Sequence, residues 1–140
     1  TAAPSNPGLK ATWHEFKGNK CSEIEKAPIN GTYPVEDVMI PKKVKGNIGL
    51  IIKGYFNAPQ DDIYTFALLS DDGSTLTIDS EQIVDNDGPH GPKEIVGQKA
   101  LAKGYHPMEL RYFDQNGGQL KLKVTGSDGK EIPFTHLYAH

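Results

Sequence analysis

The sequence lacks several features that would assign its class directly. Cys21 is the only cysteine in 140 residues, so no intramolecular disulfide can form. No motif of a reactive thiol surrounds Cys21, and we therefore expect a small buried hydrophobic side chain there. Arg111 is the only arginine among the 15 basic residues, and the formal net charge is −3. Because the lysines are scattered and form no basic patch, the sequence does not predict nucleic-acid binding.

Long apolar runs are missing as well. No segment could insert into a membrane as a helix, and no signal peptide is recognisable. The chain opens on the turn-forming residues 1–8 rather than on methionine. We expect residues 1–8 to be a linker remnant and residues 9–140 to form a single domain cut from a larger exported protein. Cysteine usage leaves the compartment open.

The sequence is rich instead in glycine and in short alternating segments. It contains 15 Gly and 10 Pro, and no stretch of helical length repeats apolar residues every 3.6 positions. Strands are predicted at 9–16, 35–40, 47–56, 81–84, 94–101 and 131–137, and in alternating runs at 64–68, 76–78, 106–112 and 120–124. Residues 17–34 are predicted to be an irregular loop. Roughly ten short strands separated by turns predict an all-β sandwich or barrel.

The most distinctive stretch is the acidic turn between two alternating runs. Tyr64, Phe66 and Leu68 share one face of the incoming strand, and Ser70-Asp71-Asp72-Gly73-Ser74 follows it. The adjacent carboxylates of Asp71 and Asp72 repel each other. Open solvent, a cation or the hydroxyl groups of a bound sugar would make the pair tolerable.

Catalysis is poorly supported by the remaining residues. The sequence has no Gly-x-Ser-x-Gly elbow, and its five histidines follow no catalytic or metal-binding pattern. His136 and His140 have a spacing that metal ligands can have, but they lie at the chain end and we interpret the spacing as incidental. Asp71 and Asp72 are neighbours and cannot flank a glycosidic bond from two sides. This segment is therefore not expected to be an enzyme.

Calcium is the better candidate ligand. It takes six to eight oxygen ligands from carboxylates, amides and carbonyls. The loops at 70–74, 85–88 and 114–118 are rich in such oxygens. The same Asp and Gly residues are equally expected in plain turns, and their spacing fits no EF-hand, so the residues alone leave both readings open.

Two segments resemble the PA14 family, named for a domain of anthrax protective antigen. Residues 54–91, GYFNAPQDDIYTFALLSDDGSTLTIDSEQIVDNDGPHG, match its Ser-Asp-Asp-Gly-Ser and Leu-x-Ile-Asp patterns. They also follow its Gly-x-Tyr-x-Phe pattern, except that Asp62 replaces the common Gly and Ile63 replaces the usual Thr or Lys. Residues 103–113, KGYHPMELRYF, match a second family motif. The resemblance implies a PA14-type β-sandwich or barrel of antiparallel strands.

The resemblance also implies a ligand set. In sugar-binding adhesins of the family, two aspartates joined by a cis peptide hold calcium, and the calcium ligates vicinal sugar hydroxyls. These residues correspond to Asp71 and Asp72, and Asp114 stands where the adhesins have Asn. The implied metal ligands are Asp71, Asp72, Asp114, Asn116 and Gly118, the last two through carbonyl oxygens. The implied sugar contacts are Asp71, Asp72 and Asn116, to which we add His90, predicted to be exposed on a Pro- and Gly-rich loop.

Two functions of different classes follow. The first is a non-catalytic carbohydrate-binding module of a secreted glycoside hydrolase, located outside the cell, in the periplasm or on the cell surface. The ending HLYAH resembles the chain terminus of hexosaminidase-like proteins of Bacteroides-type bacteria. The second is a structural or protein-docking module that shapes a neighbouring catalytic domain without binding sugar.

Overall fold

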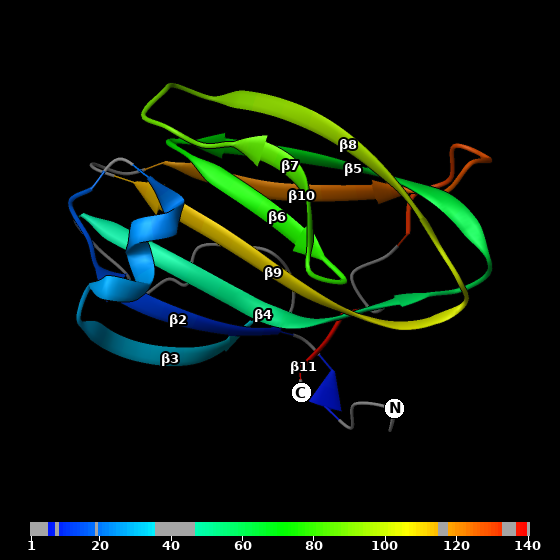
Figure 1. The fold of residues 1–140 in the computed structure, drawn as a ribbon, viewed down its shortest axis with the longest axis horizontal. Helices are drawn as coiled ribbons and strands as arrows, with labels where there is room; N and C mark the ends of the chain where they lie inside the picture. Colours follow the sequence, from blue (N-terminus) through cyan, green and yellow to red (C-terminus); the bar gives the residue numbers. More distant parts are fainter. Residues whose placement is uncertain are drawn as a thin grey trace.

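The computed structural model describes residues 6–7, 9–18, 20–35, 47–114, 118–132 and 137–139. In this part of the chain the strands are β1 (Asn6–Pro7), β2 (Leu9–Glu15), β3 (Ile29–Val35), β4 (Ile48–Ala58), β5 (Asp62–Asp71), β6 (Ser74–Ile78), β7 (Glu81–Asn86), β8 (Lys93–Leu101), β9 (Gly104–Asp114), β10 (Gln119–Thr125) and β11 (Leu137–Ala139). A short 3-10 helix, η1, spans Cys21–Lys26. Figure 1 shows the strands arranged in two layers, so the predicted all-β sandwich is confirmed.

The two layers are an eight-stranded and a three-stranded antiparallel sheet. The larger sheet has the order β1-β11-β4-β9-β6-β7, and β2 and β3 extend it beside β4. The smaller sheet has the order β10-β5-β8. Because β4 pairs with β9 along its whole length, these two strands form the centre of the larger sheet.

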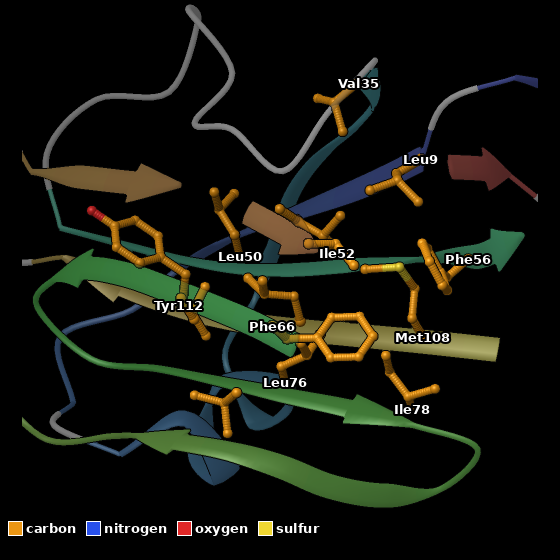
Figure 2. Packing of buried hydrophobic residues seen from close by; sticks show 14 of the residues in the cluster. Leu9, Val35, Leu50, Ile52, Phe56, Phe66, Leu76, Ile78, Met108 and Tyr112 are labelled. Atoms are coloured by element: carbon orange, nitrogen blue, oxygen red, sulfur yellow. The ribbon is translucent and has the colours of Figure 1, made fainter. Parts of the chain in front are cut away.

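The main core lies between the sheets. Along β5 every second side chain points inward, and Tyr64, Phe66 and Leu68 are at most 1% exposed. The ring of Phe56, from the larger sheet, meets Tyr64 and Phe66 edge-to-face, with centroid distances of 5.4 and 5.7 Å. Figure 2 shows Phe56, Phe66, Ile78 and Met108 around this contact. The period of two in the sequence therefore predicted the buried face correctly.

A second, smaller core lies on the outer face of the larger sheet. Cys21 and Ile24 of η1 pack with Phe16, Ile51 and Phe113. This cluster explains why residues 48–52 are all buried, on both faces of the sheet. Cys21 is 1% exposed, as expected, and burial raises the pKa of its thiol well above the usual range, so it stays protonated.

Arg111 fixes η1 to the sheet. Its guanidinium donates from Nη1 to the carbonyl oxygen of Cys21 at 3.3 Å and lies 3.4 Å from Glu25 through Nη2. Its Nε donates to Glu109 on the same strand at 3.0 Å. The only arginine of the chain thus joins η1 to β9. In the described residues η1 is the one helix, and its six residues are far too few to cross a bilayer.

The prediction of an irregular loop at residues 17–34 is partly wrong. It contains η1 and most of β3, an edge strand that pairs only with β2. The prediction failed because β3 buries only Val35 and carries Gly31 and Pro34, which are typical of loops. Residues 36–40 of the predicted 35–40 strand lie outside the described residues.

Both chain ends also differ from expectation. Of the last predicted strand, 131–137, the described residues show a bridge at Glu131 and the start of β11 at Leu137. Residues 133–136 lie outside the described part. Asn6 and Pro7, within the predicted linker, pair with β11.

Neighbouring leucines on β5 test the two-layer arrangement. Leu68 is fully buried between the sheets, whereas Leu69 faces outward and is partly exposed. We predict that Leu68→Ala lowers the free energy of unfolding by about 2–5 kcal/mol, because it leaves a cavity. Leu69→Ala should cost about 1 kcal/mol or less. Urea unfolding of both variants measures the difference, and equal losses would contradict this assignment of faces.

Candidate metal and ligand site

Three chain connections cross from one sheet to the other at the same end of the sandwich. The turn after β5 leads from the smaller sheet into β6 of the larger one. The connections from β7 to β8 and from β9 to β10 lead from the larger sheet to the smaller one. They contain the three oxygen-rich loops predicted from the sequence.

The connections are joined by backbone contacts. The amide of Phe113 donates to the carbonyl oxygen of Gly73 at 3.0 Å, which ties the β9 end to the acidic turn. A Cβ atom at Gly73 would lie 2.7 Å from backbone atoms of Gly88, so only glycine allows the β7–β8 loop to approach so closely. The acidic turn therefore lies against both the end of β9 and the start of the β7–β8 loop.

The acidic turn is held from below by two serines. Asp71 ends β5, and the peptide bond between Asp71 and Asp72 is cis, as the resemblance implies. Ser70 and Ser74 are fully buried, and their hydroxyl oxygens lie 2.6 Å apart. The Ser70 hydroxyl also donates to the carbonyl oxygen of Asp72 at 2.8 Å. The side chains of Asp71 and Asp72 are thus on a supported turn and remain partly exposed.

Tyr112 links the acidic turn to the end of β9. Its buried hydroxyl donates to the carbonyl oxygen of Asp71 at 2.6 Å. Burial, followed by the negative charges of Asp114, Asp71 and Asp72, raises the pKa of Tyr112 far above its usual range. The phenol therefore stays neutral, and it senses the field of all three carboxylates at once.

Gly118 brings the last connection against the turn. A Cβ atom at this position would lie 2.0 Å from the carbonyl oxygen of Asp71 and 2.6 Å from the Tyr112 hydroxyl. It would also lie 3.0 Å from Cγ of Asp114. Because a side chain would fill this space, Gly118 forms the wall of a small polar cradle. The next residue, Gln119, lies opposite Asp71 where β10 pairs with β5.

The β7–β8 loop holds Asp72 from the other side. The amide of His90 donates to Oδ1 of Asp72 at 3.1 Å. The predicted exposed ring of His90 is partly buried, and its nitrogens lie 2.6 Å from the Gly91 carbonyl oxygen and 2.8 Å from that of Asn86. His90 therefore fastens this loop, a role that its sequence context did not indicate.

Asn86 is a site residue that the sequence reading missed. It is 2% exposed, and its Nδ2 donates to the carbonyl oxygens of Lys93 at 2.8 Å and Leu68 at 3.3 Å, and to the Ser70 hydroxyl at 3.2 Å. The side chain of Asn86, at the end of β7 in the larger sheet, thus connects to the end of β5 and the start of β8 in the smaller sheet, beneath the acidic turn. An asparagine at the end of an alternating run looks like an ordinary turn residue, so no local signal identified it.

The structure brings together four of the five predicted metal ligands. Gly118 lies against the Asp71 carbonyl oxygen, the Tyr112 hydroxyl and the Asp114 carboxyl group, and Asp72 follows Asp71 in the turn, whereas Asn116 lies outside the described residues. Within the described ranges, no three His, Cys, Asp or Glu side chains gather closely enough to hold a metal ion by themselves. A hard cation here would therefore need carbonyl oxygens as well as carboxylates, which is the mixture that calcium accepts.

Glycine substitutions test the close approach of the loops. We predict that Gly118→Ala destabilises the protein by about 1–3 kcal/mol or more, because its Cβ would overlap the Asp71 carbonyl. Gly91→Ala is the matched control, since its Cβ would meet nothing within 4 Å. Thermal and urea unfolding compare the two, and a Gly118→Ala protein as stable as the control would contradict the proximity of this loop to the turn.

Comparison with known proteins agrees with this architecture. A family model, the PA14 domain, matches residues 5–134. The PA14 sugar-binding domain of an RTX adhesin has 17% sequence identity and a TM-score of 0.80, with 97% of this chain and 100% of that chain covered. The Epithelial Adhesin 6 A domain from Candida glabrata, solved with Galb1-3GlcNAc, has 13% identity and a TM-score of 0.71, with 99% and 88% covered.

A hydrolase also contains a similar fold. The beta-glucosidase from Kluyveromyces marxianus, solved with glucose, matches with 17% identity and a TM-score of 0.66. The match covers 86% of this chain but only 16% of the glucosidase. A search of curated protein sequences finds no match. At these identities the solved structures establish the fold, and the family match establishes membership. The sequence motifs, the two-sheet architecture and this family match show that the chain belongs to the PA14 family.

Proposed function

We propose that the protein is a non-catalytic carbohydrate-binding module that holds its sugar through a calcium ion at the acidic turn. The observation that carries the proposal is the small polar cradle at Gly118, where the Asp71 carbonyl oxygen, the Tyr112 hydroxyl and the Asp114 carboxyl group meet beside the adjacent side chain of Asp72. Carboxylates held close together repel each other, and a bound divalent cation relieves that repulsion. The carbonyl oxygen of Asn116, predicted as a ligand, and that of Gly118 would complete the shell.

Three similar structures support the sugar as the ligand class. The RTX adhesin domain is described as sugar-binding, and the Candida glabrata domain was solved with a disaccharide. Calcium bound in a shallow cradle keeps open coordination positions, which two neighbouring sugar hydroxyls can occupy. In the glucosidase the similar segment is part of a hydrolase. A module joined to a catalytic domain raises the local concentration of its sugar, so weak affinity suffices.

The proposed parent protein rests on the similar segment in a glucosidase and on the HLYAH ending, which resembles hexosaminidase-like proteins. We expect a glycoside hydrolase of the hexosaminidase-like type that acts outside the cytoplasm, in the periplasm, at the cell surface or in the medium. Calcium at millimolar levels, the range to which extracellular calcium sites respond, is available there. The catalytic domain of this parent would be the permanent neighbour of the module.

A docking role is the second candidate, and one feature favours it. Ile63 and Val96 are 53% and 54% exposed on the outer face of the three-stranded sheet. Both alternate along their strands with residues that face the core. Exposed apolar side chains on an otherwise polar face suit a contact with a neighbouring domain. In that role the module would shape the parent enzyme without binding sugar.

Calcium binding is tested by thermal unfolding. At about 10 mM calcium and a dissociation constant of about 0.1–1 mM, we predict about 1.4–2.7 kcal/mol of stabilisation, seen as a higher melting temperature. Asp72→Ala should abolish this rise. Asp85→Ala, which removes an exposed carboxylate that caps the Asp87 amide, should leave it unchanged. No calcium-dependent shift in the unmodified protein would refute the proposed metal site.

A glycan array separates the two candidate functions. We predict glycan signals in calcium that disappear with chelator and are absent in Asp72→Ala. The contrasting result, an array without any chelator-sensitive signal, would favour the docking role.

A further inference from the structure

A groove of about 500 Å³ crosses the outer face of the larger sheet, outside the acidic turn. It runs over β2, β4, β9 and β6, and it is lined in part by Lys10, Lys53, Tyr55, Thr77, Pro107 and Glu109. Its volume lies within the range of about 300–1,000 Å³ that is usual for small-ligand sites.

Part of the groove is lined by the apolar side chains of Tyr55 and Pro107. Tyr55 on β4 pairs directly with Pro107 on β9. Residues opposite each other on antiparallel strands have Cβ atoms about 4.5–5.5 Å apart, so the two side chains form one surface. Tyr55 is partly buried. An aromatic ring beside a proline offers a face to which the C–H side of a sugar ring can pack.

A row of polar side chains lies beside Tyr55 and Pro107, two residues away from them along β4 and β9. Lys53 pairs in register with Glu109, and its Nζ lies 3.5 Å from Oε1 of Glu109. Thr77 on β6 is opposite Glu109 on its other side. An ion pair and a hydroxyl beside apolar side chains are suited to hydrogen bonds with sugar hydroxyls.

The same row carries an excess of positive charge. Lys10 lies directly opposite Lys53, an arrangement of like charges that costs stability. Glu109 is the acidic partner of Lys53, but it also accepts from Nε of Arg111 at 3.0 Å. Within the described residues Lys10 forms no ion pair. A ligand carboxylate could therefore relieve the repulsion between Lys10 and Lys53.

The position of the groove disfavours an extended peptide. β4 and β9 lie inside the sheet, and their backbone groups are used in pairing with neighbouring strands. A peptide could not add a strand there, so a ligand must bind through its ring faces and polar substituents. We propose that this groove binds an acidic saccharide, with a uronate ring on Tyr55 and its carboxylate toward Lys10 and Lys53.

This site is separate from the acidic turn. Glu109 precedes Asp114 by five residues on β9, which corresponds to about 17 Å along a strand. The groove lies on the sheet face, whereas the turn lies at the strand ends. The inference thus goes beyond the proposed calcium-dependent function, and it can hold or fail independently of it.

Binding is tested with trigalacturonic acid in the presence of EDTA, followed by calorimetry and by NMR chemical shifts. Galactotriose, which is neutral, and a triglutamate peptide of the same charge serve as comparison ligands. We expect binding of trigalacturonic acid with shifts at Tyr55 and Thr77, and weaker binding of both other ligands. Asp72→Ala should leave this binding unchanged, even if that variant loses all response to calcium.

Two variants locate the contacts. Lys10→Glu should weaken binding about two- to tenfold, since it reverses an exposed charge at the site. Lys121→Glu, the same charge reversal at an exposed position of β10 in the other sheet, should have no effect. Tyr55→Ala should weaken binding about tenfold through loss of the stacking surface.

The following results would overturn the proposal. They are no binding of trigalacturonic acid in EDTA, equal binding of triglutamate, equal binding of galactotriose, or affinity that Lys10→Glu leaves intact. Loss of the binding in Asp72→Ala would assign it to the acidic turn and would likewise overturn the proposal.

Discussion

The structure depends on one topological constraint, the repeated crossing of the chain between two sheets at the same end. Each crossing leaves backbone groups without strand partners, and such groups must be satisfied inside the protein or by solvent. The amide of Asn86 and the hydroxyls of Tyr112 and Ser70 beneath the acidic turn supply these partners. The same hydrogen bonds hold the carboxylates of the acidic turn at the surface. The contacts that stabilise the fold at this end therefore also determine the shape of the site.

Local sequence patterns predicted much of the fold and part of the site. The alternation of Tyr64, Phe66 and Leu68 was readable because the two faces of a strand differ directly in the sequence. The weak edge strand β3 and the short helix η1 were not readable, since each buries few residues. The roles of Tyr112 and Asn86 depend on contacts between residues far apart in the sequence. The approach of Gly118 to Asp71 follows from the register of β10 on β5, which no local pattern specifies.

The outer faces of the module have different characters. The face of the larger sheet is covered at one end by η1, fastened by Arg111, and is hollowed and positively charged beside Tyr55. The outer face of the smaller sheet exposes two large apolar side chains, Ile63 and Val96. This division suits a module that binds sugars at its loop end and on one sheet face, while the opposite sheet face is available for a neighbouring domain.

Terbium luminescence tests whether the acidic turn binds a calcium ion. Terbium occupies calcium sites and emits when a nearby tyrosine is excited, and Tyr112 donates its hydroxyl hydrogen bond to the backbone of Asp71 within the proposed site. With a calcium site at the acidic turn, we predict sensitised emission that calcium displaces, that Tyr112→Phe strongly reduces because the donor ring is lost, and that Asp72→Ala abolishes because the ion is no longer held. Emission that is absent, or that persists unchanged in Asp72→Ala, would contradict it.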